Sequence, residues 1–196
     1  MRRDRPIAVA TKNREKFSEI ETVWGRFQPA LAFAGAQYPD VDETGDSYEV
    51  NAVLKATALA EITQAPALAD DSGIEVEAMG WRPGVRSARS PSAEASAQER
   101  NRAILAAVEG KSRTARFVCV CALVVPGFAP ITARGEVDGL IASSERGKNG
   151  FGYDPIFFFP GYDATFAEVT AQRKHAVSHR GRAVRSLQAM ISPLVE

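Results

Sequence analysis

The sequence predicts an α/β protein with a mixed central β-sheet flanked by helices. In the first half of the chain, short apolar runs of strand length alternate with stretches whose apolar residues recur every three or four positions, as in amphipathic helices. In the second half, a Pro-Gly turn separates two apolar runs, which favours a hairpin. A chain of 196 residues, 45% of them hydrophobic, is long enough to bury a core, and we expect a single domain over residues 1–196 with at most two lobes.

Hydrophobic spacing predicts the elements of the first half. Residues 7–10 form an apolar run, and the apolar residues between Phe17 and Phe27 then predict a helix with Asn13 as its N-cap. Residues 31–34 are a candidate strand. The other elements expected here are an acidic loop, a helix, a short strand that ends at an aspartate pair and an alternating strand, at residues 38–47, 50–62, 67–69 and 74–78.

The second half is predicted by the same signals. A loop rich in arginine, proline and glycine is expected at residues 80–91. After it we expect a helix opened by Ser92, a buried strand, a second strand paired with it as a hairpin, a glycine-rich loop, an apolar run and a last helix, at residues 93–108, 116–125, 131–137, 143–154, 156–159 and 179–191.

Charge and cysteine content exclude several classes of partner. The 24 basic and 24 acidic residues cancel, so the chain has no excess charge for nucleic acid or an anionic membrane. No apolar stretch approaches a membrane span, and the N-terminus lacks the apolar core of a signal peptide. Cys119 and Cys121, two apart in a predicted strand, share a face and cannot form a normal disulfide with each other. These features favour a reducing compartment, the cytoplasm.

A polar cluster, Thr11 to Lys16, follows the first predicted strand. A strand that leads into a helix N-terminus creates an anion site, because the first helical N–H groups lack intrahelical partners. Thr11, Asn13 and Lys16 add a hydroxyl, an amide and an ammonium that suit phosphate oxygens. On its own, the cluster is better explained by a capped helix with solvated lysines.

An aspartate pair, Asp70 and Asp71, follows a short apolar run. Adjacent residues in a strand point to opposite faces, so we expect the two carboxylates to have different roles. One of them could bind Mg²⁺ or orient water, with a second carboxylate supplied by the acidic loop around Glu43. The alternative is a plain aspartate-rich turn.

Two further clusters suit a nucleotide. The glycine-rich segment 147–155 offers Phe151 or Tyr153 as a stacking face for a base, unless it is a loop tethered by buried aromatics. At the start of the last predicted helix, Ser178, His179 and Arg180 can donate to carbonyl or phosphate oxygens, unless they belong to a solvated basic face. Together the four clusters predict a nucleotide site with Mg²⁺.

The motifs form an ordered series along nearly the whole chain. They read T-x-N-x-x-K at residues 11–16, E-T-G at 43–45, N-A-x-x-K-A at 51–56, ADDSGI at 69–74, PGV-x-SAR at 83–89, FGYDPIF at 151–157, FAE at 166–168 and SHRG at 178–181. In order and separation this series resembles the inosine triphosphate pyrophosphatase family, in its bacterial dITP/XTP branch.

The resemblance implies an activity and an architecture. The activity is Mg²⁺-dependent hydrolysis of non-standard purine nucleoside triphosphates (dITP, ITP, XTP) to the monophosphate and pyrophosphate, by cleavage between the α- and β-phosphates. The architecture is two lobes with the active site in the cleft between them, and the expected assembly is a homodimer. Two alternatives remain: a nucleotide-sensing or RNA-binding module without catalysis, and a pyrophosphatase acting on other modified nucleotides.

The resemblance also assigns site residues. Asp71 is the catalytic residue and a metal ligand, and Glu43 is the second metal carboxylate, with Asp70 as its rival. The substrate-binding residues that the resemblance implies are Thr11, Lys12, Asn13, Arg14, Glu15, Lys16, Ser72, Phe151, Gly152, Tyr153, Asp154, Lys174, His179 and Arg180. N–H groups of Arg180 and histidine would donate hydrogen bonds to the C6 carbonyl of hypoxanthine or xanthine, and they would face the amine of adenine unfavourably.

Several positions depart from the family's usual pattern. Lys12 and Glu15 stand where the family usually has glycine, Trp81 and Arg82 replace a common Gly-Gly, and His175 replaces Asn or Ser. Glu15 beside a triphosphate is unfavourable unless it points away, and Lys12 is a cation that could offset it. These changes bear on affinity and loop geometry.

Overall fold

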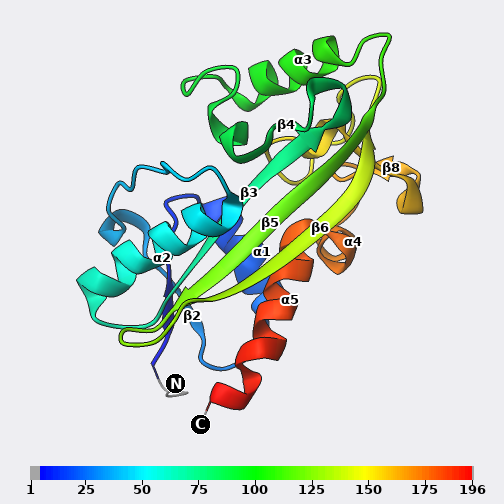
Figure 1. Ribbon diagram of the computed structural model, residues 1–196. Helices are drawn as coiled ribbons and strands as arrows, with labels where there is room; N and C mark the ends of the chain where they lie inside the picture. Colours follow the sequence, from blue (N-terminus) through cyan, green and yellow to red (C-terminus); the bar gives the residue numbers. More distant parts are fainter. Residues whose placement is uncertain (1–4, 196) are drawn as a thin grey trace. The chain divides into compact units, whose positions relative to one another are not determined.

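The computed structural model describes residues 5–195, apart from the side chain of Gln37, and contains one mixed sheet (Figure 1). The strand order is β2-β1-β3-β5-β6-β7-β8, with β4 beside β3. The strands are β1 Ile7–Val9, β2 Leu31–Phe33, β3 Ala67–Val76, β4 Arg82–Pro83, β5 Thr114–Val124, β6 Ile131–Ile141, β7 Phe157–Phe159 and β8 Ala164–Thr165. β1 is parallel to β2 and β3, whereas the β3–β4, β6–β7 and β7–β8 pairs are antiparallel. The predicted fold class is therefore confirmed.

The helices are α1 Arg14–Trp24, α2 Tyr48–Thr63, α3 Ala97–Ala107, α4 Ala171–Val177 and α5 His179–Ile191. Short 3₁₀ turns link several elements, among them η3 Gly84–Arg89 and η4 Asp154–Ile156. Within residues 5–195, no helix is both long enough and apolar enough to cross a membrane.

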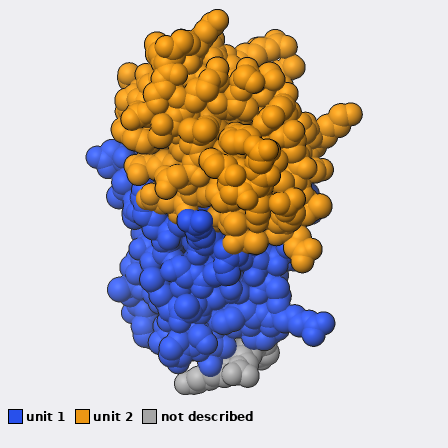
Figure 2. Space-filling model, turned by 90° about the vertical axis from the view of Figure 1, so that its right-hand side faces the viewer, with its two compact units in different colours: residues 1–71, 119–135, 179–196 blue, residues 72–118, 136–178 orange. Residues whose placement is uncertain are grey.

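The chain divides into two compact units, coloured separately in Figure 2. Unit 1 contains the chain up to Asp71, then Cys119–Gly135, and the chain from His179 onward. Unit 2 contains Ser72–Val118 and Glu136–Ser178. The division falls inside β3, between the second aspartate of the pair and the serine that follows it.

In unit 1, helices α1 and α5 pack side by side against one face of the strands, and α2 lies on the other side (Figure 1). Ile20 and Trp24 of α1 meet Leu187 and Ile191 of α5 in a core that includes Leu68 of β3. The stripe of apolar residues predicted the buried face of α1, and Asn13 is its N-cap as predicted.

Unit 2 has its own aromatic core. The rings of Phe117 and Phe157 lie 4.3 Å apart between centroids, and those of Phe157 and Phe166 lie 5.0 Å apart. Ile74 of β3 and Ile104 of α3 pack into the same cluster. Helix α3 and the segment before β7 are therefore anchored to one core.

Three expectations about elements need correction. β3 runs without a break from Ala67 to Val76, because buried cations neutralise the aspartate pair that was expected to end the strand. Helix α3 begins after Ser96, where a capping box with Glu99 satisfies its first turn, rather than after Ser92. Helix α4 was not predicted.

The predicted hairpin is confirmed. Strands β5 and β6 are neighbours in the sheet, and residues 125–130, which join them, are too short a connection for a parallel crossover.

Candidate active site

The predicted phosphate cluster is a capped helix start. The side-chain oxygen of Asn13 accepts hydrogen bonds from the backbone N–H groups of Glu15 (2.8 Å) and Lys16 (3.0 Å). The hydroxyl of Thr11 in turn accepts from the backbone N–H of Asn13 at 3.1 Å. Two helical N–H groups are thus occupied by the cap, so the side chains must supply most of any contact with an anion.

The other residues of this cluster face different surroundings. The ammonium of Lys12 lies 2.6 Å from a carboxylate oxygen of Asp40 on the surface, so Lys12 pairs with Asp40 rather than with Glu15. Arg14 stacks on the ring of Phe33, 4.6 Å from its centroid. Glu15 is exposed. Lys16 is half-buried and turns toward Asp70, with Nζ 3.5 Å from Oδ2.

Asp70 is buried on the α1 and α5 side of β3. Its Oδ2 accepts hydrogen bonds from Nη2 and Nε of Arg180, at 3.0 and 3.3 Å. Arg180 is itself buried and also pairs with Glu19 of α1. Burial alone would raise the pKa of Asp70, but Lys16 and Arg180 hold it well below its usual value. Lys16 and Arg180 therefore favour the anionic form of Asp70, and Arg180 is fixed between two carboxylates.

Asp71 points to the opposite face of β3, toward α2, as strand alternation predicts. Its Oδ1 lies 2.7 Å from Nζ of Lys55, and its Oδ2 accepts a weak hydrogen bond from the Asn51 amide at 3.4 Å. The same Lys55 ammonium lies 2.9 Å from Oε1 of Glu43. One buried cation thus holds the two carboxylates that were expected to bind a metal.

In the group formed by Glu43, Lys55 and Asp71, burial and neighbouring charges shift the pKa values in opposite directions. Burial raises the pKa of Asp71 above its usual value, although the nearby Lys55 acts to lower it. Burial also disfavours the charge of Lys55, but Asp71, Asp70 and Glu43 raise its pKa above the usual value. Of the two aspartates on β3, Asp71 is therefore the one that more readily takes up a proton.

The donor set fits a small divalent cation. Glu43 and Asp71 bring two carboxylates together on the Lys55 ammonium, which contacts one oxygen of each, and Mg²⁺ typically takes one or two carboxylates together with waters and substrate phosphates. Among the described residues, no group of three or more His, Cys, Asp or Glu is arranged to hold a metal. Asp70 is less suited than Glu43, because Arg180 and Lys16 already bind it.

A backbone contact orders the loop that carries Glu43. Asn51, fully buried on α2, accepts a hydrogen bond from the backbone N–H of Gly45 at 2.9 Å. A Cβ at position 45 would lie 2.5 Å from that same amide oxygen, so glycine is required there. Asn51 and Lys55 lie one turn apart on the same face of α2. From there Asn51 contacts Asp71 and the loop that carries Glu43, and Lys55 contacts both carboxylates.

In unit 2, the predicted base-binding residues form a second group. The ammonium of Lys174 pairs with Asp154, whose Oδ2 also accepts the backbone N–H of Phe151 at 2.9 Å. The same ammonium lies 5.3 Å from the centroid of the Phe151 ring. Phe151 and Gly152 are half-buried. Phe151 is therefore held by a buried ion pair while part of its surface remains exposed.

Tyr153 lies in different surroundings from Phe151. It is buried in the unit 2 core, its hydroxyl donates to the backbone carbonyl of Ser87 at 2.7 Å, and burial raises its pKa to about 12. It tethers the loop and offers no free face for a base. Of the two aromatic rings expected to stack, Phe151 is the one with exposed surface.

The remaining predicted residues lie where elements meet. His179 is buried and opens α5, directly after Ser178, which ends α4. β6 approaches this point so closely that a Cβ at Gly135 would lie 2.2 Å from the His179 carbonyl oxygen. Ser72 is half-buried, immediately after Asp71 on β3.

Sequence reasoning missed three buried residues of this site: Asn51, Lys55 and Glu19. Asn51 and Lys55 were visible as the N-A-x-x-K-A motif, and their spacing places them on one helical face. Glu19 carries no such signal, because its partner Arg180 lies 161 positions along the chain.

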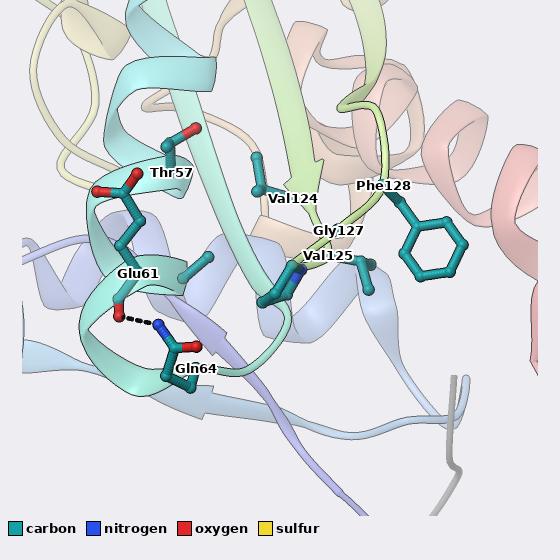
Figure 3. Close-up of a pocket in the computed structure, with 9 residues that line it drawn as sticks. Thr57, Glu61, Gln64, Val124, Val125, Gly127 and Phe128 are labelled. Atoms are coloured by element: carbon teal, nitrogen blue, oxygen red, sulfur yellow. Dashed lines mark hydrogen bonds between the residues drawn. The ribbon is translucent and has the colours of Figure 1, made fainter.

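A pocket of about 260 Å³ lies elsewhere in unit 1, between α2 and the β5–β6 connection (Figure 3). Thr57, Glu61 and Gln64 line it from α2 and its end, and Val124, Val125 and Phe128 from the hairpin. None of the residues predicted from the sequence lines this pocket.

The fold and the group formed by Glu43, Lys55 and Asp71 define an α/β protein whose charged site lies at β3, just beyond its parallel pairing with β1. The chain belongs to the Ham1 family, whose sequence model matches residues 7–190. A dITP/XTP pyrophosphatase from Exiguobacterium sp. is 42% identical over 194 residues, covering 97% of this chain and 98% of the relative. A dITP/XTP pyrophosphatase from Geobacter sulfurreducens is 43% identical over 187 residues, with 93% and 94% covered.

A solved structure shares the fold. The HAM1 protein from Coxiella burnetii has a TM-score of 0.85 and 38% sequence identity, covering 96% of this chain and 98% of that one. The family resemblance stated from the motifs is thus confirmed.

Proposed function

We propose that this chain is a pyrophosphatase that hydrolyses non-standard purine nucleoside triphosphates (dITP, ITP and XTP) to the monophosphate and pyrophosphate. The observation that carries the proposal is the meeting of Glu43 and Asp71 on the Lys55 ammonium. Relatives that cover nearly the full chain bear the name dITP/XTP pyrophosphatase, which supports the same reaction.

Glu43 and Asp71 are the proposed ligands of Mg²⁺. When bound there, the ion supplies neutralisation of phosphate charge and polarisation of the phosphoryl group. Lys55 holds the two carboxylates in place and limits their mutual repulsion. Asp70, held by Arg180 and Lys16, is not part of the proposed ligand set.

Asp71 is the proposed proton acceptor for the attacking water. Its raised pKa supports this role, since a base works best when its pKa lies near the operating pH. Lys16, half-buried beside Asp70, is the proposed charge partner of the triphosphate. The negative charge that develops on the leaving pyrophosphate is then met by an ammonium already in place.

Phe151 is the proposed stacking partner of the purine, with Lys174 and Asp154 fixing its position. Ser72 and the side chains of Thr11, Asn13 and His179 remain proposed substrate contacts. The proposed role of Arg180 in the site is indirect: it holds Asp70 and Glu19 in position, because both carboxylates already bind its guanidinium.

Assembly as a homodimer, location in the cytoplasm and a single functional domain over residues 1–196 are parts of the same proposal. Equilibrium sedimentation of the purified protein tests the first of these, with a monomer at all concentrations as the contrary result.

The reaction is tested by its products. The purified protein is incubated with dITP and Mg²⁺, and the nucleotides and phosphates are separated by ion-exchange chromatography. Equal amounts of dIMP and pyrophosphate are expected. Formation of dIDP and orthophosphate would reject cleavage between the α- and β-phosphates, and tight binding without turnover would favour a nucleotide sensor.

A further inference from the structure

Asn101 is a buried polar residue on the apolar face of α3. It is 2% exposed and lies one turn before Ile104, which packs into the aromatic core of unit 2. An aliphatic side chain would suit such a position better, because a buried amide must find hydrogen-bond partners to offset its desolvation.

The side-chain amide of Asn101 is only partly satisfied by hydrogen bonds. Its Nδ2 donates to the backbone carbonyl of Gly152 at 3.3 Å. Its Oδ1 is buried and has no hydrogen-bond partner among the described residues. A buried acceptor without a donor destabilises a fold. Asn101 is therefore not explained as a residue that stabilises the core, and its distinctive contribution is the bond to Gly152.

Gly152 lies at the centre of the loop proposed to receive the base. The backbone N–H of Phe151, on one side, is bound by Asp154, and Tyr153, on the other side, is tied to Ser87. The bond from Asn101 fixes the carbonyl between these two tethers. Gly152 has a φ of +63°, and a Cβ there would meet no atom within 4 Å, so packing does not fix this peptide by itself.

We propose that Asn101 is a positioning residue for purine recognition, which sets the orientation of the Phe151 ring through the Gly152 carbonyl. The inference rests on the proposed function in one respect, that Phe151 stacks on the base. Asn101 acts on the affinity for the purine and leaves the phosphate chemistry of β3 and α2 unchanged.

The test replaces Asn101 by leucine, which fills the same space without the hydrogen bond. Asn101→Asp is the second variant, because it keeps the shape and turns an acceptor toward the carbonyl of Gly152. Gln98→Glu is the matched control, an amide-to-carboxylate change at an exposed position of the same helix. For each protein we would measure kcat and KM for dITP, the inhibition constant of inorganic tripolyphosphate, and Tm.

Both Asn101 variants should raise KM for dITP roughly five- to tenfold, the loss that one hydrogen bond corresponds to, with kcat changed less than about threefold. Inhibition by tripolyphosphate, which has no base, should stay at the parent value, and Asn101→Leu should melt no lower than the parent. An unchanged KM in Asn101→Leu overturns the proposal. Equal losses for dITP and tripolyphosphate, with a lowered Tm, also overturn it and indicate a structural role.

The parent protein separates failure of this inference from failure of the proposed function. If the parent does not hydrolyse dITP, the proposed function fails whatever the variants do, and dITP binding by calorimetry then replaces KM as the readout for Asn101. If the parent does hydrolyse dITP and the Asn101 variants match it in KM, only the positioning role fails.

Discussion

Replacing Asp70 by asparagine tests the role of the buried ion pairs in unit 1. The substitution keeps the shape of the side chain and removes the charge that Arg180 binds at 3.0 Å and Lys16 at 3.5 Å. Removing one partner of a buried pair typically costs about 3–5 kcal/mol. Because Glu19 still holds Arg180, we expect the lower end, about 3 kcal/mol at pH 7. For a chain of this length that corresponds to a fall in Tm of roughly 6–12 °C.

The pH dependence of that difference gives a sharper test. The pKa of Asp70 is lower in the folded than in the unfolded protein, so its ionisation stabilises the fold above about pH 4 and the stabilisation is lost as the pH falls. With an unfolded pKa of about 3.9, the parent loses about 1.3 kcal/mol from this group between pH 7 and pH 3. Asp70→Asn lacks this carboxylate and does not lose that stability. The difference in free energy of unfolding between parent and variant should therefore shrink from about 3 kcal/mol at pH 7 to about 1.7 kcal/mol at pH 3.

The assay is denaturant unfolding at both pH values, in the presence of a chelator, with Asp138→Asn as the control. Asp138 is exposed on β6, and its replacement should change stability by less than about 0.5 kcal/mol. A deficit for Asp70→Asn that stays constant or grows on acidification would refute the assignment of Asp70 as the buried anion of this group.

Three further substitutions test other parts of the account. Asp71→Asn should lower kcat for dITP by at least about 10²-fold while calorimetry still detects nucleotide binding. Near-parent turnover in this variant would contradict a catalytic role for Asp71. Lys16→Ala should lower kcat/KM for every triphosphate by a similar factor, and a loss confined to one base would contradict its assignment to the phosphates. Tyr153→Phe should lower the free energy of unfolding by about 1 kcal/mol, because the hydrogen bond to Ser87 is lost. In an ultraviolet pH titration, the variant should lack one tyrosine that ionises at high pH. Because burial raises the pKa of Tyr153 to about 12, its neutral form stabilises the fold below about pH 10 and this is lost as the pH rises toward 12; a titration unchanged by the substitution would be the contrary result.

The placement of the aspartate pair on β3 could be predicted because strand geometry is local. Side chains alternate along a strand whatever packs against it, so Asp70 and Asp71 had to face opposite sides. The sequence did not determine whether the strand continued past them. That depended on buried cations from α1, α2 and α5, which are brought to β3 only by the tertiary fold.

Long-range pairing explains most of what the sequence left open. Glu19 has the spacing of an ordinary helix residue, and its burial depends on Arg180 in the last helix. In the glycine-rich loop, Phe151 and Tyr153 are both aromatic, and only the core of unit 2 determines which ring is buried. Helix α4 is short and has no apolar stripe, so periodicity gave no sign of it.

The central claim is that the site hydrolyses non-standard purine nucleotides in preference to ordinary ones. The most direct measurement compares kcat/KM for dITP, XTP, dGTP, dATP and dCTP with Mg²⁺, following pyrophosphate and monophosphate together. We expect efficient release of pyrophosphate from dITP and XTP, with the other three nucleotides at least about 10²-fold less efficient. Equal efficiency on all five nucleotides would contradict the account of base recognition, and an absence of turnover on every one would contradict the proposed catalysis.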